Sequence, residues 1–470
     1  MSRRLSCLLI ASVAAAHAAI FIAYQRPDWN TQWTDQNGYL LLGRLLAKTG
    51  RFTRFANTPL YVPEAIRTPV YPALVAGLDL VFGESHVVIA LAQAALFVII
   101  CWLVYAIGRA VTSDRIAMAA GLVTALYPPL PYFGALVLTE TLTTFLVTTG
   151  MALWLRALRQ SGAERKGTVG PFLASGLVFA LTALTRPAFQ YLPLFLMAAG
   201  VFAPRDVRRL RWRGGLVMLA AFFAAVVPWL AYNAVYFKSV TFTPAGGPGR
   251  QLFEGTWQVQ LPGRVETELT TIADSTPDRT TLDERVRAVA ARSRLPAEPM
   301  LRYVHQHQDI RRIWTEPQDP WERVSARIAA DREYWRVGLE NIRQNPVRHV
   351  WRRAVRGTFL LWASEIPVRY SDINRLSPLT IRAIWLSQVA LMLLAAWGAV
   401  VLARRRARDE ALAIAALVLY ITAVHTPLYA EARYSLPAMP MILLLTTVAV
   451  ADLVGRFRHP SESVLRTVTS

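Results

Sequence analysis

Blocks of consecutive apolar residues, each about 20 residues long and interrupted by few charges, recur along this chain of 470 residues. A helix of that length crosses the hydrocarbon core of a bilayer. Charged residues make up 17% of the chain and hydrophobic residues 54%, which leaves too little charge to cover the surface of a soluble protein of this size. The sequence therefore predicts an all-α, polytopic membrane protein.

Ten transmembrane spans are predicted from these blocks. They are residues 5–24, 86–108, 116–133, 137–157, 171–186, 189–203, 214–236, 381–403, 410–428 and 436–454. Pro128, Pro129 and Pro131 end the third span, because proline lacks the amide that a continuing helix needs. The first span follows Arg3 and Arg4 and resembles a signal peptide, but no small-residue cleavage site follows it. We therefore interpret it as a retained first helix.

Arginines cluster in the short connectors between the spans, and this placement predicts the orientation of the chain. The connectors are Arg3–Arg4, Arg109–Arg115, 156–166, 205–213, 404–408 and 456–458. By the positive-inside rule they mark the cytoplasmic face of a bacterial inner membrane, with both termini inside. The net charge of +20 is explained in this way, so no nucleic-acid partner is expected.

The same topology divides the chain into three regions. Residues 1–236 form an N-terminal transmembrane region with a first outer loop at 25–85, and residues 381–470 form a C-terminal transmembrane region with a cytoplasmic tail. Residues 237–380 form a mostly helical periplasmic loop, with exposed helices at 281–294 and 321–343. Residues 36–49 have an apolar face and indicate either an amphipathic helix at the outer membrane interface or an ordinary short loop helix.

Two motifs in the first outer loop carry candidate chemistry. Asp35 lies in Trp33-Thr-Asp-Gln-Asn-Gly-Tyr39, where a carboxylate at the membrane surface can be a general base or a cap of the following helix. Arg67 begins Arg67-Thr-Pro-Val-Tyr-Pro72, which the two prolines would hold extended. Its guanidinium can bind a phosphate or carboxylate, or anchor a lipid headgroup.

Further polar residues lie at the predicted outer ends of the spans. Glu140 starts the fourth span and Arg186 ends the fifth. These two residues either have a functional role or form a structural ion pair with each other. A last cluster lies in the turn between the final two spans, where a loop position favours function over packing. It consists of His425, Glu431, Arg433 and Tyr434. A cavity opening outward and lined by these groups would suit an anionic, lipid-linked substrate.

Several other kinds of chemistry find no support in the sequence. His305 and His307 are two residues apart and would lie on different faces of a helix, which disfavours a metal pair. Cys7 and Cys101 fall in predicted spans without metal-ligand spacing. The chain has no GxGxxG, P-loop, GxSxG or HExxH motif, so nothing indicates nucleotide-driven chemistry or a serine or metal hydrolase.

Taken in order, the motifs resemble those of membrane glycosyltransferases with the GT-C fold. The resemblance is to the bacterial branch related to dolichyl-phosphate-mannose protein mannosyltransferases (glycosyltransferase family 39) and to aminoarabinose transferases of lipid A. The matching pieces are Asp35–Tyr39, Arg67–Pro72, Leu138–Thr141, Leu184–Pro187, Pro228–Asn233, Gly246–Gly249, Asn345–Pro346 and His425–Pro437.

This resemblance implies an inverting transfer of a sugar from a polyprenyl-phosphate donor at the periplasmic face. It implies that Asp35 is the general base. It implies that the donor phosphate is bound by Arg67, Arg186, Lys238 and Arg433. The residues implied to support the cavity are Tyr39, Tyr71, Glu140, His425, Glu431 and Tyr434.

The sequence also departs from the family pattern. Members often carry two acids together in the first outer loop, whereas here Asp35 is followed by Gln36. No cofactor is therefore expected, and a divalent metal is not indicated. The expected partners are the polyprenyl-phosphate sugar, the bilayer, and a lipid, glycan or protein acceptor. The only large soluble part that the sequence predicts is the 237–380 loop, and no large C-terminal periplasmic domain is expected, so the identity of the acceptor does not carry over from the family.

Other functions remain as alternatives. A transporter or flippase of lipid-linked saccharides would place its charges near the bilayer midplane and in broken helices. A periplasmic ligase or polymerase would rely on arginine and histidine instead of an aspartate. A structural membrane protein would need none of these groups. The predicted gathering of polar residues at outer helix ends favours chemistry at the membrane surface.

Overall fold

The computed structural model describes residues 2–29, 34–162, 169–200, 205–369, 372–405 and 407–458, and the regular elements of this part of the chain are all helices. Some predicted features lie outside the described residues. These are Trp33 of the first motif, Lys166 of a predicted connector, residues 201–203 of the sixth span, and the tail beyond residue 458. The prediction of an all-α protein is confirmed.

Within the described residues, six helices are long and apolar enough to cross a membrane, so the chain is a multi-pass membrane protein. They are α1 (Arg3–Gln25), α4 (His86–Val111), α7 (Glu140–Gly162), α10 (Arg205–Phe237), α18 (Pro378–Arg404) and α20 (Met439–Arg458). Shorter helices complete the bundle. They are α3 (Val70–Phe82), α5 (Asp114–Ala125), α6 (Pro129–Gly134), α8 (Val169–Thr185), α9 (Leu192–Ala199) and α19 (Arg408–His425).

The predicted count of ten spans is not confirmed. The third predicted span, 116–133, is broken, because α5 ends at Ala125 and α6 starts afresh at Pro129. The sixth, 189–203, is reduced in the described residues to a 3-10 turn (Pro187–Phe189) and the eight-residue α9. Helix α3 is apolar, although the prediction assigned its residues to the first outer loop.

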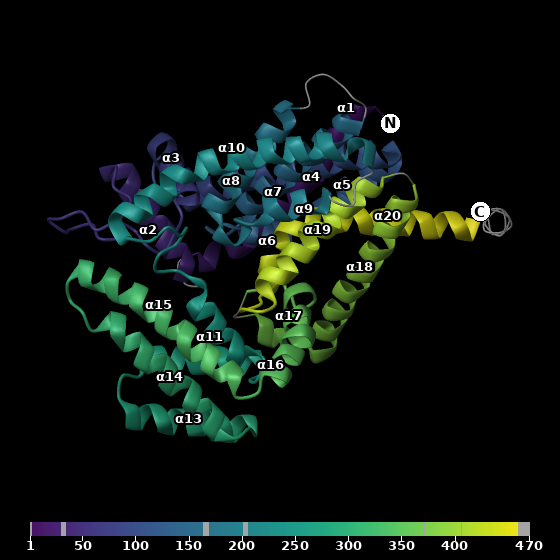
Figure 1. Cartoon of the computed structure of the whole chain (residues 1–470). Coiled ribbons are helices and arrows are strands. Elements are labelled where there is room, and N and C mark those ends of the chain that lie inside the picture. Colours follow the sequence, from purple (N-terminus) through teal and green to yellow (C-terminus); the bar gives the residue numbers. More distant parts are fainter. Residues whose placement is uncertain are drawn as a thin grey trace.

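Serine caps and close glycine contacts set the helix starts and the packing of the bundle. The side-chain oxygens of Ser85, Ser113 and Ser377 accept N–H groups at the starts of α4, α5 and α18. Helices α18 and α20 approach closely at Gly398, where a Cβ would lie 1.9 Å from the Leu445 carbonyl oxygen. The start of α1 and the end of α20 lie at the end of the bundle opposite α2 and α3 (Figure 1).

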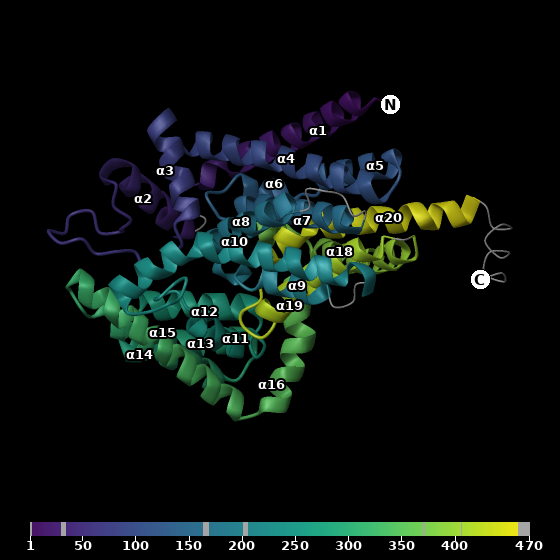
Figure 2. The same cartoon turned by 45° about the horizontal axis from the view of Figure 1, so that its top comes forward.

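Residues between α10 and α18 are mostly helical, as predicted, and the helices between residues 248 and 343 share a core that is separate from that of the bundle. The helices are α11 (Pro248–Gln258), α12 (Gly263–Ser275), α13 (Arg279–Ser293), α14 (Ala297–Thr315), α15 (Pro320–Arg343), α16 (Pro346–Arg352) and α17 (Thr358–Trp362). We call them the helical layer. Phe253, Trp257 and Tyr303 are fully buried in its core. The layer lies on the side of the bundle away from α1 and α4 (Figure 2).

The two predicted exposed helices of this region are α13 and α15, and each is amphipathic. Leu282 and Val286 of α13 are fully buried, as is most of Tyr334 of α15. Their polar faces carry the arginines that the sequence pattern placed on the surface, for example Arg292 and Arg336. The helices are therefore exposed on one side only.

The predicted helix at 36–49 is α2 (Thr34–Thr49), and its apolar face packs against α3. Leu42 is fully buried, and at Gly43 a Cβ would lie 2.4 Å from the Val75 side chain. The prediction that prolines hold residues 67–72 extended is wrong beyond Pro69, because α3 starts at Val70. Pro72 lies in its first turn, where the amide that proline lacks has no helical partner.

Candidate active site

A cavity of about 620 Å³ lies where the membrane bundle meets the helical layer. Its walls come from α2, from the segment before α3, from the facing ends of α7 and α8, from residues 429–434, and from α11, α12 and α15. Eight of the residues predicted from the sequence line it together. They are Asp35, Tyr39, Arg67, Glu140, Arg186, Glu431, Arg433 and Tyr434.

Asp35 and Arg67 form one side of this cavity. Asp35 lies in the first turn of α2, and its Oδ1 accepts a hydrogen bond from Arg67 Nη2 at 2.9 Å. The Arg67 guanidinium lies over the Tyr39 ring, 4.0 Å from its centroid. Gly38 makes room for it, because a Cβ there would come within 3.0 Å of Arg67 Nη2. The spacing of Asp35, Gly38 and Tyr39 thus positions the arginine.

Arg433 joins this pair to the carboxylate of Glu140. Its Nη1 lies 3.8 Å from Asp35 Oδ2 and 3.7 Å from Glu140 Oε1, and its Nε donates to Glu431. Arg186 Nη1 approaches Glu140 Oε1 at 3.4 Å, and Arg186 Cζ lies 4.5 Å from the centroid of the Tyr434 ring. Carboxylates and guanidinium groups therefore alternate around the wall of the cavity.

The two central carboxylates differ in their access to the cavity. The Asp35 side chain is 45% exposed, whereas that of Glu140 is 3% exposed. Burial acts to raise the pKa of Asp35, but the neighbouring guanidinium groups of Arg67 and Arg433 outweigh it and hold that pKa below its ordinary value. Asp35 is thus the ionised carboxylate that a bound substrate can reach, and Glu140 positions arginines.

Buried amide side chains fix the segment that leads into Glu140, and the sequence analysis missed this role. Gln36 Oε1 accepts from the Val137 amide at 2.8 Å, and Gln93 Nε2 donates to the Leu136 carbonyl at 2.6 Å. Trp29 Nε1 donates to the Ala135 carbonyl at 2.9 Å. The signal was present at Gln93, since a glutamine inside an apolar span needs partners.

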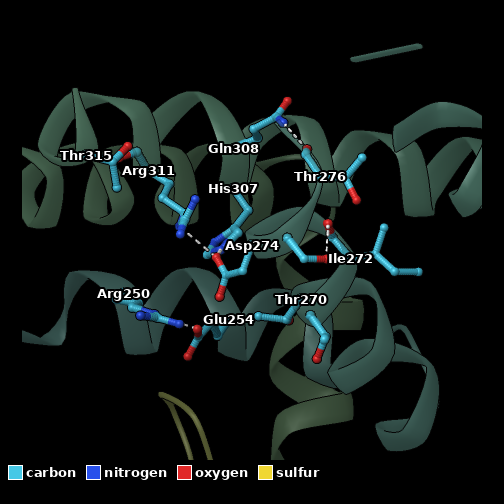
Figure 3. A network of polar contacts seen from close by, with 12 residues as sticks. Arg250, Glu254, Thr270, Ile272, Asp274, Thr276, His307, Gln308, Arg311 and Thr315 are labelled. Atoms are coloured by element: carbon cyan, nitrogen blue, oxygen red, sulfur yellow. Dashed lines mark hydrogen bonds and ion pairs between the residues drawn. The ribbon is translucent and has the colours of Figure 1, made fainter. Parts of the chain in front are cut away.

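The helical layer supplies the far wall of the cavity. Figure 3 shows Arg250 and Glu254 of α11 facing Thr270 and Asp274 of α12. The Arg250 Nε–Glu254 Oε1 distance is 2.7 Å, and Asp274 is held by Arg311 at 2.8 Å. Sequence reasoning did not select these residues, because they come together from separate helices.

Glu266 is the most perturbed carboxylate of that wall. Burial, together with the charges of Glu254 and Glu431, raises the pKa of Glu266 to about 8. The Tyr429 hydroxyl donates to its Oε2 at 3.5 Å. Glu266 is therefore protonated at neutral pH and offers an O–H donor to the cavity.

Comparison with known proteins agrees with this architecture. Residues 66–232 match the family described as dolichyl-phosphate-mannose-protein mannosyltransferase. The archaeal oligosaccharyltransferase AglB from Archaeoglobus fulgidus, in complex with an inhibitory peptide and a dolichol-phosphate, matches with a TM-score of 0.53 and 13% identity. That match covers 99% of this chain and 52% of AglB, so the chain spans about half the length of that enzyme. The chain has the GT-C fold.

Two further comparisons complete the findings. The Archaeoglobus fulgidus oligosaccharyltransferase tethered to an acceptor peptide gives a TM-score of 0.53 and 13% identity, over 98% of this chain and 51% of that chain. ArnT from Cupriavidus metallidurans, bound to undecaprenyl phosphate, gives a TM-score of 0.43 and 14% identity, over 97% of this chain and 80% of that chain. No curated protein sequence matches the chain.

Three predicted site residues of this GT-C chain lie outside the cavity. Lys238 is exposed at the end of α10, where its ammonium group donates to the Val235 carbonyl. Tyr71 is fully buried, donates to Gln93, and packs edge-on against Tyr39. His425 is buried with its ring against Tyr434, 4.7 Å between centroids. Tyr71 and His425 thus support cavity residues from behind, and Lys238 contacts none of them.

The residues of the cavity do not fit a divalent metal site. In the part of the chain that the structure describes, no group of three His, Cys, Asp or Glu could hold a metal ion. The space between Asp35 and Glu140 is bridged by the guanidinium of Arg433. Gln36, which follows Asp35, is buried and bonded to backbone groups.

Proposed function

We propose that this GT-C protein is an inverting glycosyltransferase, which moves a sugar from a polyprenyl-phosphate donor to an acceptor hydroxyl. The observation that carries the proposal is the position of Asp35. It is a partly exposed, ionised carboxylate that lies inside a cavity between two guanidinium groups, at the edge of a membrane-spanning bundle. A base beside a phosphate site is what this transfer requires.

Arg67, Arg186 and Arg433 are proposed to bind the donor phosphate. Each now contacts a carboxylate or an aromatic ring, and all three line one cavity. Guanidinium groups bind phosphate oxygens through paired, charge-assisted hydrogen bonds, which contribute about 1.5–3 kcal/mol each. The AglB structure with the same fold holds a dolichol-phosphate, which supports a lipid phosphate as the ligand. Lys238 is not part of the proposed site.

The reaction balances with these groups alone. The acceptor oxygen forms a bond to the anomeric carbon of the sugar, and the bond from that carbon to the phosphate oxygen breaks. Asp35 takes the proton of the acceptor hydroxyl, and the polyprenyl phosphate leaves as an anion that the arginines stabilise. A single displacement with one base inverts the configuration of the anomeric carbon.

Donor binding would also activate Asp35. Before binding, Arg67 and Arg433 hold the pKa of Asp35 low, which makes it a weak base. A phosphate that engages those guanidinium groups cancels part of their positive charge, so the pKa of Asp35 rises toward its ordinary value. Proton transfer to Asp35 then becomes more favourable only when the donor is present.

The cavity is proposed to open on the periplasmic side of a bacterial inner membrane. The start of α1 and the arginine-rich ends of α18 and α20 lie at the end of the bundle opposite α2 (Figure 1), and α2 contributes to the wall of the cavity. Arginine-rich connectors remain on the cytoplasmic side of a membrane. A lipid-linked sugar and its acceptor would therefore meet at the outer surface.

Turnover of a panel of polyprenyl-phosphate sugars by the purified protein, with membrane extracts as acceptors, tests this function. We expect one donor to be consumed, with release of polyprenyl phosphate and a product of inverted anomeric configuration. Arg67→Ala and Arg186→Ala should weaken binding of polyprenyl phosphate. Arg109→Ala should not, because Arg109 is a partly exposed arginine that pairs with Asp114 and does not line the cavity. Consumption of no donor, combined with movement of lipid-linked sugar across vesicles, would instead establish a transporter.

A further inference from the structure

Arg327 is a cation without an acidic partner inside the cavity. It lies on α15, and its guanidinium stacks on Trp314 of α14, 4.1 Å from the ring centroid. Among the described residues, no carboxylate comes within ion-pair distance of it. The other arginines of the cavity, Arg54, Arg67, Arg186, Arg250 and Arg433, each have a carboxylate partner.

The acids nearest to Arg327 are committed elsewhere. Asp331 lies one helical turn further along α15, at the i,i+4 spacing at which arginine and aspartate usually pair. Its carboxylate instead accepts the amides of Gly249 and Arg250 at the start of α11, at 3.4 and 3.2 Å. At Gly249 a Cβ would lie 1.9 Å from the Asp331 carbonyl oxygen, so this close contact fixes α15 against α11.

Glu64 is committed in the same way. It is 1% exposed, and both of its oxygens accept from Arg54, at 2.6 and 2.7 Å. Oε1 also accepts the backbone amides of Ile66 and Arg67, at 2.7 and 3.2 Å. Its charge is therefore already shared among four donors, and none of them is Arg327.

The surroundings of Arg327 are unfavourable for its charge. Burial, with the positive charges of Arg54 and Arg250, lowers the pKa of Arg327 to about 10. A partly buried, unpaired cation of this kind is stabilised when an anion binds to it. The stacked ring of Trp314 holds the planar guanidinium in place for bidentate hydrogen bonding to an anion.

Arg327 also lies at a junction of two spaces. With Arg54 and Trp314 it lines both the main cavity and an adjoining apolar pocket of about 220 Å³, whose other walls include Phe55 and Val324. Arg67 is near enough for its charge to act on Arg327, but Arg67 donates to Asp35 whereas Arg327 stacks on Trp314.

We propose that Arg327, flanked by Arg54 and Arg250, is a second anion-binding subsite, which takes a phosphate or carboxylate group other than the donor phosphate bound at Arg67. The assignment of the anion to a donor or an acceptor rests on the proposed function, whereas anion binding at Arg327 does not depend on it. The anionic group has two sources: a charged acceptor, or the second phosphate of a diphosphate-linked donor.

Inorganic phosphate is the probe, and thermal unfolding of the purified full-length protein is the readout, with saturating short-chain polyprenyl phosphate present to fill the site at Arg67. We expect phosphate to raise the unfolding temperature of the wild type. Arg327→Gln should bind phosphate at least about tenfold more weakly, and Arg327→Lys several-fold more weakly. Arg336→Gln is the matched control, because Arg336 lies on the exposed face of the same helix, paired with Glu333 and Glu340.

Affinity for polyprenyl phosphate and for polyprenyl diphosphate separates the two sources. If the acceptor carries the anion, Arg327→Gln binds both lipids as the wild type does. If the donor carries the anion, Arg327→Gln binds polyprenyl phosphate as the wild type does but binds polyprenyl diphosphate at least about tenfold more weakly. An equal phosphate response in the wild type and Arg327→Gln, or no response in the wild type, overturns the proposal. A wild type that responds to phosphate but not to polyprenyl phosphate would contradict the donor site alone.

Discussion

At the scale of single residues, the cavity shows how environment separates groups of the same chemistry. Asp35 and Glu140 are both carboxylates that contact Arg433, but only Asp35 is open to the cavity. Glu266, on the opposite wall, is buried beside the negative charges of Glu254 and Glu431, which raise its pKa. Position relative to arginines and to solvent thus distinguishes the proposed base, Asp35, from a buried acid that contacts arginines and from a protonated hydrogen-bond donor.

The raised pKa of Glu266 predicts a specific dependence of stability on pH. Because its pKa is about 8 when folded and 4.5 as an ordinary value, the folded protein keeps a proton in this window that the unfolded chain releases. The contribution of Glu266 to stability is therefore present below pH 4.5 and is lost as the pH rises to 8. A glutamine imitates the neutral acid and removes this loss.

Thermal unfolding of the wild type and Glu266→Gln across this pH range measures the effect. We expect nearly equal unfolding temperatures below pH 4.5 and a more stable variant near pH 9. Glu268→Gln is the control, because Glu268 is an exposed carboxylate of the same helix and pairs with Arg292. A constant difference between wild type and Glu266→Gln at every pH would rule out the titration of Glu266.

At the scale of elements, α11 connects the helical layer to the segment that carries Glu431 and Arg433. Gln258 of α11 donates to the Ala430 carbonyl at 2.8 Å and accepts the Ala430 amide at 3.1 Å. Gly255, one turn earlier, allows the approach, because a Cβ there would lie 2.3 Å from the Leu428 carbonyl oxygen. This contact holds α11, which lines the cavity, against the segment that carries two other lining residues, Glu431 and Arg433.

Gly255→Ala should therefore separate α11 from residues 428–430. We expect a loss of about 1–3 kcal/mol of stability, since backbone atoms at that contact cannot move aside cheaply. Gly77→Ala is the control. Gly77 lies inside α3 with open space around it, so alanine there should be neutral or stabilise by about 0.5–1 kcal/mol. Equal thermal stability of the two variants would show that α11 does not dock at Gly255.

The sequence predicted some elements and site residues well and others not at all. Long apolar blocks predicted α1, α4 and α18, since hydropathy is a local property. The topology drawn from the arginine-rich connectors predicted that Asp35, Arg67 and Glu140 would share a face. The pairing of Glu266 with Tyr429 was beyond such reasoning, because it depends on a contact between distant segments. Arg327 was missed for the same reason, since its lack of a partner is visible only after folding.

At the scale of the whole molecule, the cavity lies between the membrane bundle, which faces lipid, and the helical layer, which faces water. The bundle presents apolar surface to lipid, and the helical layer carries exposed arginines and acids on a core of its own. A substrate with a lipid tail and a polar head suits such a boundary, because each part remains in its preferred surroundings. The proposed reaction therefore requires the helical layer and the termini to lie on opposite sides of the membrane.

Labelling with a membrane-impermeant maleimide tests that orientation in intact cells. In a background with Cys7 and Cys101 replaced, Arg343→Cys at the end of α15 should react, because it lies on the helical layer. Arg404→Cys at the end of α18 should react only after the membrane is opened. The reverse pattern would place the cavity in the cytoplasm and contradict the proposed topology.

The account depends most on Asp35 as the base of sugar transfer. The most direct measurement is the rate of donor turnover by purified Asp35→Asn, with Asp309→Asn as a control that removes an exposed carboxylate of the helical layer. We predict that Asp35→Asn still binds polyprenyl phosphate but transfers sugar on the order of 10²-fold more slowly or worse, while Asp309→Asn matches the wild type. Transfer by Asp35→Asn above about a tenth of the wild-type rate would show that this carboxylate is not the base.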